Sequence, residues 1–519
     1  MLRKILPVCL PVLSLALAAC PQSNDRPGVK PGPTPETPVP VPPPKPAPPN
    51  AATHAFQNTP SGPPAGWTGP VFQLSHDYPT QAPAACDPAV CTWLQLKVDF
   101  GDGTRAPDWT GGGWAAYMAA LLTYIEQGQD PNLANDRGFV AQVDGKTRWY
   151  HVPWMAYDPT VGRDFVHGTT NERTASLGDF VGDKGGGVNA LPPAMVEDSC
   201  EKTWAHGFET WAVGMYNEYG GWVFGNAFPA AGADAGAPQT TLDPTTQRLL
   251  LAGLPFPQGT LVAKILTTNA PVDCVASLRN SPEWQIHRHK TTTSNEYLCE
   301  REVATSRVIQ LDVAVVDERS PTRWVYGTFV YDGAQPGPTF WDRLVPLGVQ
   351  WGSDDRAWPA VRGERAKSAP VVQSVLNALP AALYEHEGCN GRLAGPVDSK
   401  MSSCVSCHGG SFSPAPAGTI ATMGTNEPPV FGFEGLCAVD LASPDSQWTL
   451  NNAYFKDAPY PAAYTDPAYA SAIPLDTSLQ LQVALSQYAV FKNYNAPAAC
   501  TLDAQLEQTA AAPTAAHAQ

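Results

Sequence analysis

The residues with the clearest chemistry form one short run in the last quarter of the chain, Cys404-Val405-Ser406-Cys407-His408. Two cysteines separated by two residues and followed at once by a histidine are the attachment signature of a c-type haem. The two thiols add across the two vinyl groups of the porphyrin, and the histidine is then held beneath the iron. The motif therefore predicts one haem c, with thioether bonds from Cys404 and Cys407 and with His408 as an axial iron ligand.

Two other uses of the cysteine pair remain open. A redox-active dithiol has the same Cys-x-x-Cys spacing, but it normally belongs to a βαβ unit. A structural zinc site needs two further ligands at close spacing, and none is evident near Cys407. The residues after the motif include Gly409, Gly410, Pro414 and Pro416. This context supports neither alternative, so haem attachment is the favoured interpretation.

The sixth iron position decides what such a haem does. A methionine ligand raises the reduction potential and is typical of an electron carrier, whereas an open position admits small molecules. Met423 lies 15 residues after His408 among Pro and Gly residues, and it is the candidate axial ligand; a vacant position is the alternative. His167, His206 and His386 are further candidates, although such histidines more often lie on the surface or have their hydrogen bonds satisfied. No catalytic residue is assigned.

Residues 1–20 read as an export signal. Arg3 and Lys4 precede an apolar stretch at 5–19, which is shorter than the roughly 20 residues of a spanning helix. The stretch ends in Leu17-Ala18-Ala19-Cys20, which resembles the bacterial lipoprotein signal, whose cysteine is lipidated. The resemblance implies a lipid anchor on Cys20 in the cell envelope, at an outer membrane and facing the periplasm or the surface. An ordinary secretory signal with a chance cysteine is the alternative.

Composition divides the remaining chain. Residues 21–50 contain 13 prolines, which predicts an extended tether that we take to end at residue 66. Region 67–365 is rich in Trp, Gly and β-branched runs and predicts a β-rich body. Region 366–500 contains the haem motif, and the Ala-rich tail 501–519 is expected to be disordered.

Local patterns predict the main elements. Runs of β-branched and aromatic residues predict strands at 260–266, 308–316 and 324–331. Helical composition is found at 114–126, 371–384 and 479–491, the last behind a plausible Asp476 cap. These elements predict an α+β fold with a mostly antiparallel β body and a small helical and loop haem c segment.

Export to an oxidising compartment makes disulfides plausible. Apart from the cysteines of the signal, the lipidation site and the haem motif, eight remain. The even number permits four disulfides, but their connectivity does not follow from the sequence. Proximity alone gives two candidate pairs, Cys86 with Cys91 and Cys274 with Cys299.

The charge balance limits the partners. Lys and Arg number 32 and Asp and Glu number 48, so the net charge is −16. This excludes broad electrostatic binding to nucleic acid, which requires basic patches. The lipid anchor would make the membrane one partner. The redox partner is expected to be basic or neutral, and its identity and the oligomeric state are left open.

Segment 257–408 resembles the mono-haem cytochromes c that carry a lysine cross-link to the haem and oxidise hydroxylamine, and their β-sheet relatives, the beta-type cytochromes c-prime. The shared order is a strand at each of 259–264, 311–315 and 324–329, followed by the haem motif. The resemblance implies a haem against an antiparallel sheet, with Lys264 matching the cross-linked lysine. The alternative for Lys264 is a lysine on the exposed face of a strand. About 70 residues separate Tyr331 from Cys404, which is more than this family usually has.

The chain also resembles a set of exported bacterial mono-haem cytochrome c lipoproteins without a settled activity. That resemblance depends on the runs RDFVHGTTNER at 163–173 and WAVGMYN at 211–217. The expected function is covalent haem c binding and electron transfer in an exported lipoprotein. One alternative is an open-site haem enzyme acting on hydroxylamine, nitric oxide or peroxide, and another is a haem-based gas sensor or binding lipoprotein.

Overall fold

The structure is a computed structural model. It describes residues 55, 63–105, 107–129, 139, 142–143, 146–155, 157, 169–171, 209–229, 235–244, 249–273, 275–291, 297–354, 371–379, 392–398, 403–413, 457 and 473–493. The chain divides into Met1–Pro46 and one compact unit, Ala47–Gln519. The signal at 1–20, nearly all of the tether and the tail at 501–519 lie outside the described residues, and so do Cys20 and Met423.

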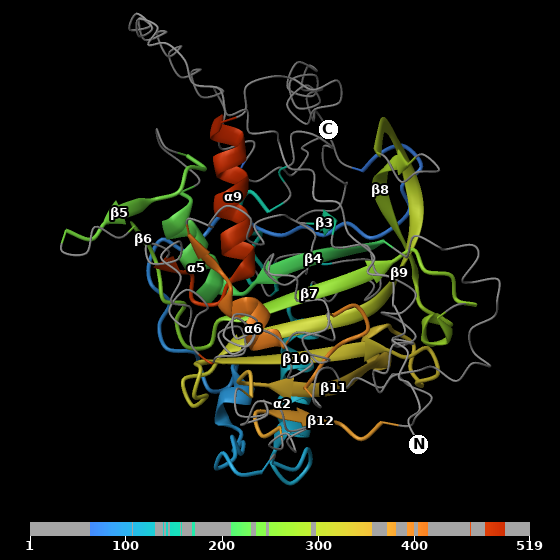
Figure 1. Cartoon of the computed structure of the whole chain (residues 1–519). Helices are drawn as coiled ribbons and strands as arrows, with labels where there is room; N and C mark the ends of the chain where they lie inside the picture. Colours follow the sequence, from blue (N-terminus) through green and yellow to red (C-terminus); the bar gives the residue numbers. More distant parts are fainter. Residues whose placement is uncertain are drawn as a thin grey trace, which may run out of the picture. The chain divides into compact units, whose positions relative to one another are not determined.

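An eight-stranded antiparallel sheet forms the centre of the compact unit (Figure 1). Its strands are β3 (Thr169–Asn171), β4 (Thr210–Tyr216), β7 (Leu261–Thr268), β8 (Glu283–Thr291), β9 (Tyr297–Val316), β10 (Trp324–Tyr331), β11 (Leu344–Gln350) and β12 (Ser374–Leu376). Seven of them follow the order β12-β11-β10-β9-β7-β4-β3, and β8 pairs with the first half of the long β9. The predicted α+β fold with a mostly antiparallel β body is confirmed.

The central strands are covered on both faces. All eight residues of β10 are buried, and only Lys264 keeps partial exposure in β7. Strands with two covered faces read as continuous apolar runs of β-branched and aromatic residues, which is the pattern of these segments. The strands predicted at 260–266, 308–316 and 324–331 are therefore confirmed by β7, β9 and β10.

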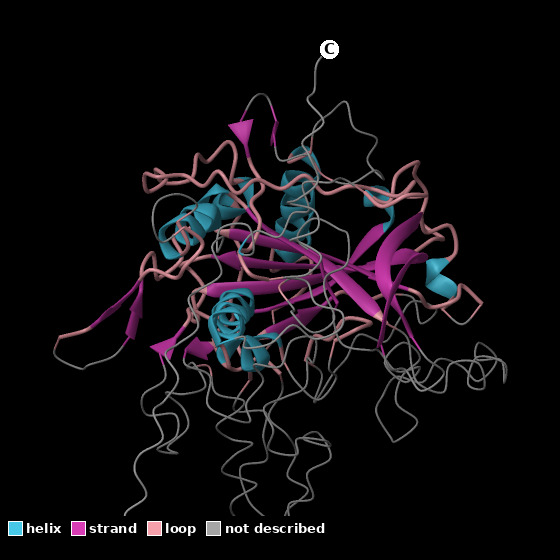
Figure 2. Ribbon diagram, turned by 90° about the horizontal axis from the view of Figure 1, so that it is seen from above, coloured by secondary structure: helices cyan, strands magenta, loops and turns pink. Residues whose placement is uncertain are grey.

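The back face of the sheet, defined by Ala263, Ile265 and Val313, packs against α2 (Trp114–Gln127) in the larger hydrophobic core. The Trp114 ring stacks on Trp351, with ring centroids 4.8 Å apart and an angle of 11° between the planes. Figure 2 shows helices on both sides of the sheet. The helix predicted at 114–126 is confirmed, and its aromatic residues anchor it to the sheet.

The start of α2 depends on Gly113, whose backbone is left-handed at φ 81°. A Cβ at this position would collide with the backbone carbonyl of Lys97. We expect Gly113→Ala to lower the free energy of unfolding by about 1–2 kcal/mol for the left-handed conformation and by a further 1–3 kcal/mol or so for the collision. Urea unfolding measures this effect.

Gly66→Ala is the matched control, because Gly66 also has a left-handed backbone, at φ 84°, and no atom lies within 4 Å of its missing Cβ. It is expected to show the conformational cost of roughly 1–2 kcal/mol alone. Equal losses in the two variants would contradict the role of the Lys97 contact.

The front face, defined by Val262, Lys264, Asp312, Tyr326 and Thr328, is the opposite side of the same strands. Directly paired residues of antiparallel strands share a face, and the register aligns these residues across β7, β9 and β10. Two further helices pack in the hydrophobic core on this side, α5 (Glu218–Ala227) and α9 (Leu479–Asn493). The short helix α6 (Cys404–Gly409) lies in front of the sheet in Figure 1. The helix predicted at 479–491 is confirmed by α9.

The helix predicted at 371–384 is wrong within its described part, 371–379. Residues 374–376 form the short strand β12, which pairs with β11 at the edge of the sheet. The preceding backbone is fixed by Asp354, whose carboxylate accepts hydrogen bonds from the N–H groups of Val372 and Gln373. The backbone of residues 372–376 thus finds hydrogen-bond partners on strand β11 and on Asp354. Both partners are distant in the sequence, so the local composition does not predict a strand here.

The remaining elements are short. Three two-stranded sheets pair β1 (Gln142–Val143) with β2 (Lys146–Thr147), β5 (Thr240–Leu242) with β6 (Leu249–Leu251), and β13 (Phe412–Ser413) with β14 (Ile473–Pro474). The 3-10 helices are η1 (Thr92–Gln95), η3 (Ala276–Leu278) and η4 (Trp341–Arg343). The predicted Cys86–Cys91 disulfide is present just before η1. Cys274 and the side chain of Cys299 lie outside the described residues.

Candidate haem site

The haem motif forms α6, a helix of six residues that begins with a capping box. The Ser403 hydroxyl accepts a hydrogen bond from the Ser406 N–H at 3.0 Å, and the Ser406 hydroxyl accepts one from the Ser403 N–H at 2.9 Å. These bonds satisfy backbone donors that the first helical turn leaves unpaired. Because residues three apart lie on one side of a helix, Cys404 and Cys407 are neighbours on its surface.

Gln350 and the sheet fix the position of the first cysteine. The Cys404 N–H donates to the side-chain oxygen of Gln350 at 2.6 Å. The side chain of Cys404 packs against apolar residues of the front face. Cys404 and Cys407 are half-buried and are not joined in a disulfide. Both side chains thus keep surface that another group can contact.

The electrostatics at Cys404 oppose thiolate formation. Burial raises the pKa of the Cys404 thiol well above its ordinary value, and the carboxylates of Asp398 and Asp312 raise this pKa further. Dithiol oxidoreductases rely on a nucleophilic cysteine with a lowered pKa. The surroundings of Cys404 are therefore the reverse of those that a redox dithiol requires, whereas a thioether has no proton to lose.

The ring of His408 is fixed on two sides. Its Nδ1 atom lies 2.9 Å from the carbonyl oxygen of Thr477, and its ring centroid lies 4.7 Å from that of Tyr326. Burial lowers the pKa of His408 to about 4; the Thr477 hydrogen bond opposes this shift, and the charge of Lys264 adds to it. The imidazole is therefore neutral at pH 7. Since a carbonyl oxygen only accepts hydrogen bonds, the proton belongs on Nδ1, and Nε2 keeps its lone pair for a metal.

A row of polar side chains crosses the front face near this histidine. Lys264, Asp312 and Thr328 are direct neighbours on β7, β9 and β10. The Asp312 carboxylate accepts hydrogen bonds from the Thr328 hydroxyl at 2.9 Å and from Gln310 Nε2 at 2.8 Å. Gln310 Nε2 also lies 3.1 Å from a carboxylate oxygen of Asp398. The row therefore joins the sheet to the segment 392–398.

Lys264 is half-buried and is the one residue of β7 that keeps partial exposure. Its charge acts on both Asp312 and His408. Lys264 thus belongs to the surroundings of the haem motif. The cross-link itself remains a proposal.

The capping residue of α9 differs from the prediction. The Leu481 N–H donates to the Ser478 hydroxyl at 3.2 Å, so Ser478 caps the helix. Asp476 points to the sheet instead and binds Arg323 with an Nη1 to Oδ1 distance of 2.7 Å. Both residues follow the usual preference for caps, and only the tertiary contact with Arg323 separates them.

The sequence did not identify Thr477, Asp312, Asp398 or Gln350 as part of the site. The Thr477 carbonyl lies 69 residues beyond His408, and Gln350 lies 54 residues before Cys404. No local pattern connects such pairs. One local signal was available: serine is a preferred N-cap residue, and Ser403 stands at the N-cap of α6.

No metal site of another kind is found in the described part of the chain. There, no group of three or more His, Cys, Asp or Glu side chains is placed to hold a metal ion. The zinc alternative therefore has no ligand set among these residues. A haem iron differs, because the porphyrin supplies four of its ligands and the protein only the axial ones.

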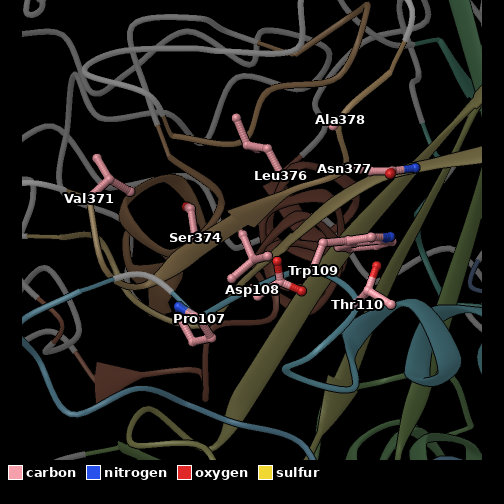
Figure 3. A pocket seen from close by; sticks show the side chains of 10 residues that line it. Pro107, Asp108, Trp109, Thr110, Val371, Ser374, Leu376, Asn377 and Ala378 are labelled. Carbon is pink, nitrogen blue, oxygen red and sulfur yellow. The ribbon is translucent and has the colours of Figure 1, made fainter.

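A pocket of about 570 Å³ lies elsewhere, between the loop at 107–110 and β12 (Figure 3). Trp109, Asp108 and Asn377 are among the residues that line it. Asp108 accepts a hydrogen bond from the Gly111 N–H, and the Asn377 amide donates to the Pro346 carbonyl at 2.9 Å. Because these polar groups serve the local backbone, the pocket gives no argument for a ligand.

Comparisons with models of known protein families, with curated proteins and with solved structures found no match to this chain. Among the helices that the structure describes, none is long and apolar enough to cross a membrane.

Proposed function

We propose that this chain carries one covalently attached haem c and transfers electrons. Cys404 and Cys407 would form the two thioether bonds, and Nε2 of His408 would bind the iron. The observation that carries the proposal is the hydrogen bond between His408 Nδ1 and the Thr477 carbonyl. Histidines that ligate metals commonly donate their other N–H to a carbonyl or carboxylate, which fixes the ring and raises its basicity. When bound, the haem supplies an iron that cycles between two oxidation states.

The surroundings of the motif suit this task. Val405, Tyr326, Leu475 and Leu481 belong to the same buried apolar cluster, which Cys404 contacts. A low dielectric around a metal centre and restricted access of water are two means by which a protein sets the reduction potential. The residues of the chain would thus fix the histidine, exclude water from one side and keep the Cys404 thiol neutral until attachment.

We further propose that Cys20 is lipidated and that the tether connects the folded unit to a membrane of the cell envelope, at an outer membrane and facing the periplasm or the surface. Attachment of haem c takes place outside the cytoplasm, so the export signal and the haem motif support each other. The net charge of −16 favours a basic or neutral redox partner.

The optical spectrum of the reduced protein with and without carbon monoxide tests electron transfer against small-molecule chemistry. With Met423 as the sixth ligand, we expect a low-spin spectrum that carbon monoxide leaves unchanged. The control is Met423→Ala, which should bind carbon monoxide because the position is then open. Rapid binding by the wild-type protein would overturn the carrier proposal.

Lys264 favours one second candidate, an open-site haem enzyme acting on hydroxylamine, nitric oxide or peroxide. Its charge acts on His408, and the resembling family uses a lysine at this position for a cross-link to the haem. The same spectrum decides this point, because a cross-linked haem has a red-shifted Soret band. An ordinary Soret band in the wild-type protein removes the cross-link.

A further inference from the structure

The turn between β14 and α9 contains two adjacent residues with left-handed backbones. Asp476 has φ 50° and Thr477 has φ 60°. Such a conformation is uncommon for residues other than glycine and strains the backbone at each position. A strained backbone persists only where the surrounding contacts hold it in place. The contacts of this turn therefore indicate which groups it positions.

The carboxylate of Asp476 makes those contacts. Its Oδ1 atom accepts from Arg323 Nη1 at 2.7 Å and from Trp324 Nε1 at 3.4 Å, and its Oδ2 atom accepts from the Phe256 N–H at 2.8 Å. Arg323 also donates from Nη2 to the Phe256 carbonyl at 2.8 Å. Side-chain exposure is 15% for Asp476 and 35% for Arg323, so the ion pair is partly shielded from solvent.

The contacts of Asp476 fix the position of the next residue, Thr477. Its carbonyl oxygen lies 2.9 Å from His408 Nδ1, and its hydroxyl accepts a hydrogen bond from the Tyr326 hydroxyl at 2.7 Å. The ring of Tyr326 packs on the ring of His408. Both groups that fix the imidazole are therefore connected to the turn that Asp476 stabilises.

We infer that Arg323 and Asp476 form a positioning pair for His408. The pair fixes the Thr477 carbonyl, the carbonyl sets the strength of the hydrogen bond from Nδ1, and that bond sets how strongly the imidazole donates electrons to the iron. A stronger donor stabilises the oxidised iron and lowers the reduction potential. The inference rests on the proposed haem function. Neither residue touches the haem motif directly in the contacts described above.

The test compares the reduction potentials of Arg323→Gln and Asp476→Asn with that of the wild type, measured by spectroelectrochemistry on the full-length haem-loaded protein. If the pair positions His408, the reduction potential should rise in both variants, because both substitutions release the Thr477 carbonyl. At fixed ambient potential the ratio of reduced to oxidised haem should increase about tenfold, which is about 59 mV for one electron. Simple electrostatics predicts opposite shifts, since one variant loses a positive charge near the haem and the other a negative charge.

Two controls separate positioning from general destabilisation. Arg323→Lys keeps the positive charge, so its reduction potential should lie closer to that of the wild type than the potential of Arg323→Gln does. Glu209→Gln removes a carboxylate that is paired with Arg288 and equally shielded, at 16% exposure, and it should leave the potential unchanged.

The two possible failures are distinguishable. A wild-type protein without covalent haem overturns the proposed function, and this inference with it. A haem-loaded wild type whose two variants shift in opposite directions, or do not shift, overturns the positioning pair alone. If the glutamine and asparagine variants fail to fold, Arg323→Lys decides the point. Lysine keeps the charge but cannot reproduce the two-pronged hydrogen bonding of Arg323 to Asp476 and Phe256, so a raised reduction potential supports the inference and a wild-type potential contradicts it.

Discussion

Replacing Cys404 and Cys407 together by alanine is expected to remove all haem that survives denaturing electrophoresis. Thioether bonds withstand denaturation, whereas a haem bound only through His408 dissociates when the chain unfolds. The variant should still fold, because the capping box of Ser403 and Ser406 and the hydrogen bond from the backbone of residue 404 to Gln350 do not involve the sulfur atoms. Haem staining of the gel and the spectrum of the purified protein measure the loss.

The matched control removes the other cysteine pair of the described chain. Cys86→Ala with Cys91→Ala deletes two sulfur atoms joined in a disulfide just before η1, and it should keep the full amount of covalent haem. Staining that persists in the Cys404 and Cys407 variant would refute the central proposal. Equal loss in both double variants would point to a general folding defect instead.

Strands with strong local signals were predictable from the sequence. β7, β10 and the second half of β9 are runs of β-branched and aromatic residues, a composition that favours strands buried on both faces. α2 and α9 were predictable as well, because each is a continuous run of helix-forming residues. The haem motif was visible because its five residues are adjacent in the chain.

Features that depend on distant partners were not predictable. The segment at 374–376 is a strand because β11 offers it an edge and Asp354 accepts its preceding N–H groups. Asp476 is an ion-pair partner and not a cap because Arg323, 153 residues away, reaches it. Long-range contacts override local propensity in both cases, and they also determine the wider surroundings of His408.

The second prediction with a large effect concerns Asp312. Burial raises the pKa of Asp312 to about 8; Asp398 adds to the shift, and Lys264 opposes it. The unfolded chain should titrate this carboxyl near its ordinary value of about 3.9. Between these values the folded state binds a proton that the unfolded state lacks. The contribution of Asp312 to stability is therefore complete below about pH 4 and is lost as the pH rises through 8, at up to about 1.4 kcal/mol per pH unit.

Asp312→Asn should remove this pH dependence. The amide has no charge to desolvate, and its oxygen still accepts from Thr328 and Gln310. We expect the variant to have a smaller decrease in the free energy of unfolding between pH 6.5 and 8, and to be more stable than the wild type at pH 8. Urea unfolding of the two proteins across this range measures both effects. His408 does not interfere, because its lowered pKa makes a contribution that is complete above about pH 6.5 and is lost as the pH falls towards 4.

Asp342→Asn is the control. It makes the same substitution at a carboxyl whose pKa is shifted in the opposite direction. Hydrogen bonds from Thr339 lower the pKa of the exposed Asp342. The contribution of Asp342 to stability is therefore lost only as the pH falls below the ordinary pKa of a carboxyl, and between pH 6.5 and 8 the variant should keep the wild-type dependence of stability on pH.

The charged groups around Asp312 are Lys264 on β7 and Asp398 in the segment at 392–398, with the Cys404 thiol on α6 nearby. Equal slopes in wild type and Asp312→Asn would mean that Lys264 already compensates the ionised carboxyl. The raised pKa of Asp312 would then be refuted, and Lys264 would be neutralised by a full negative charge beside the haem motif.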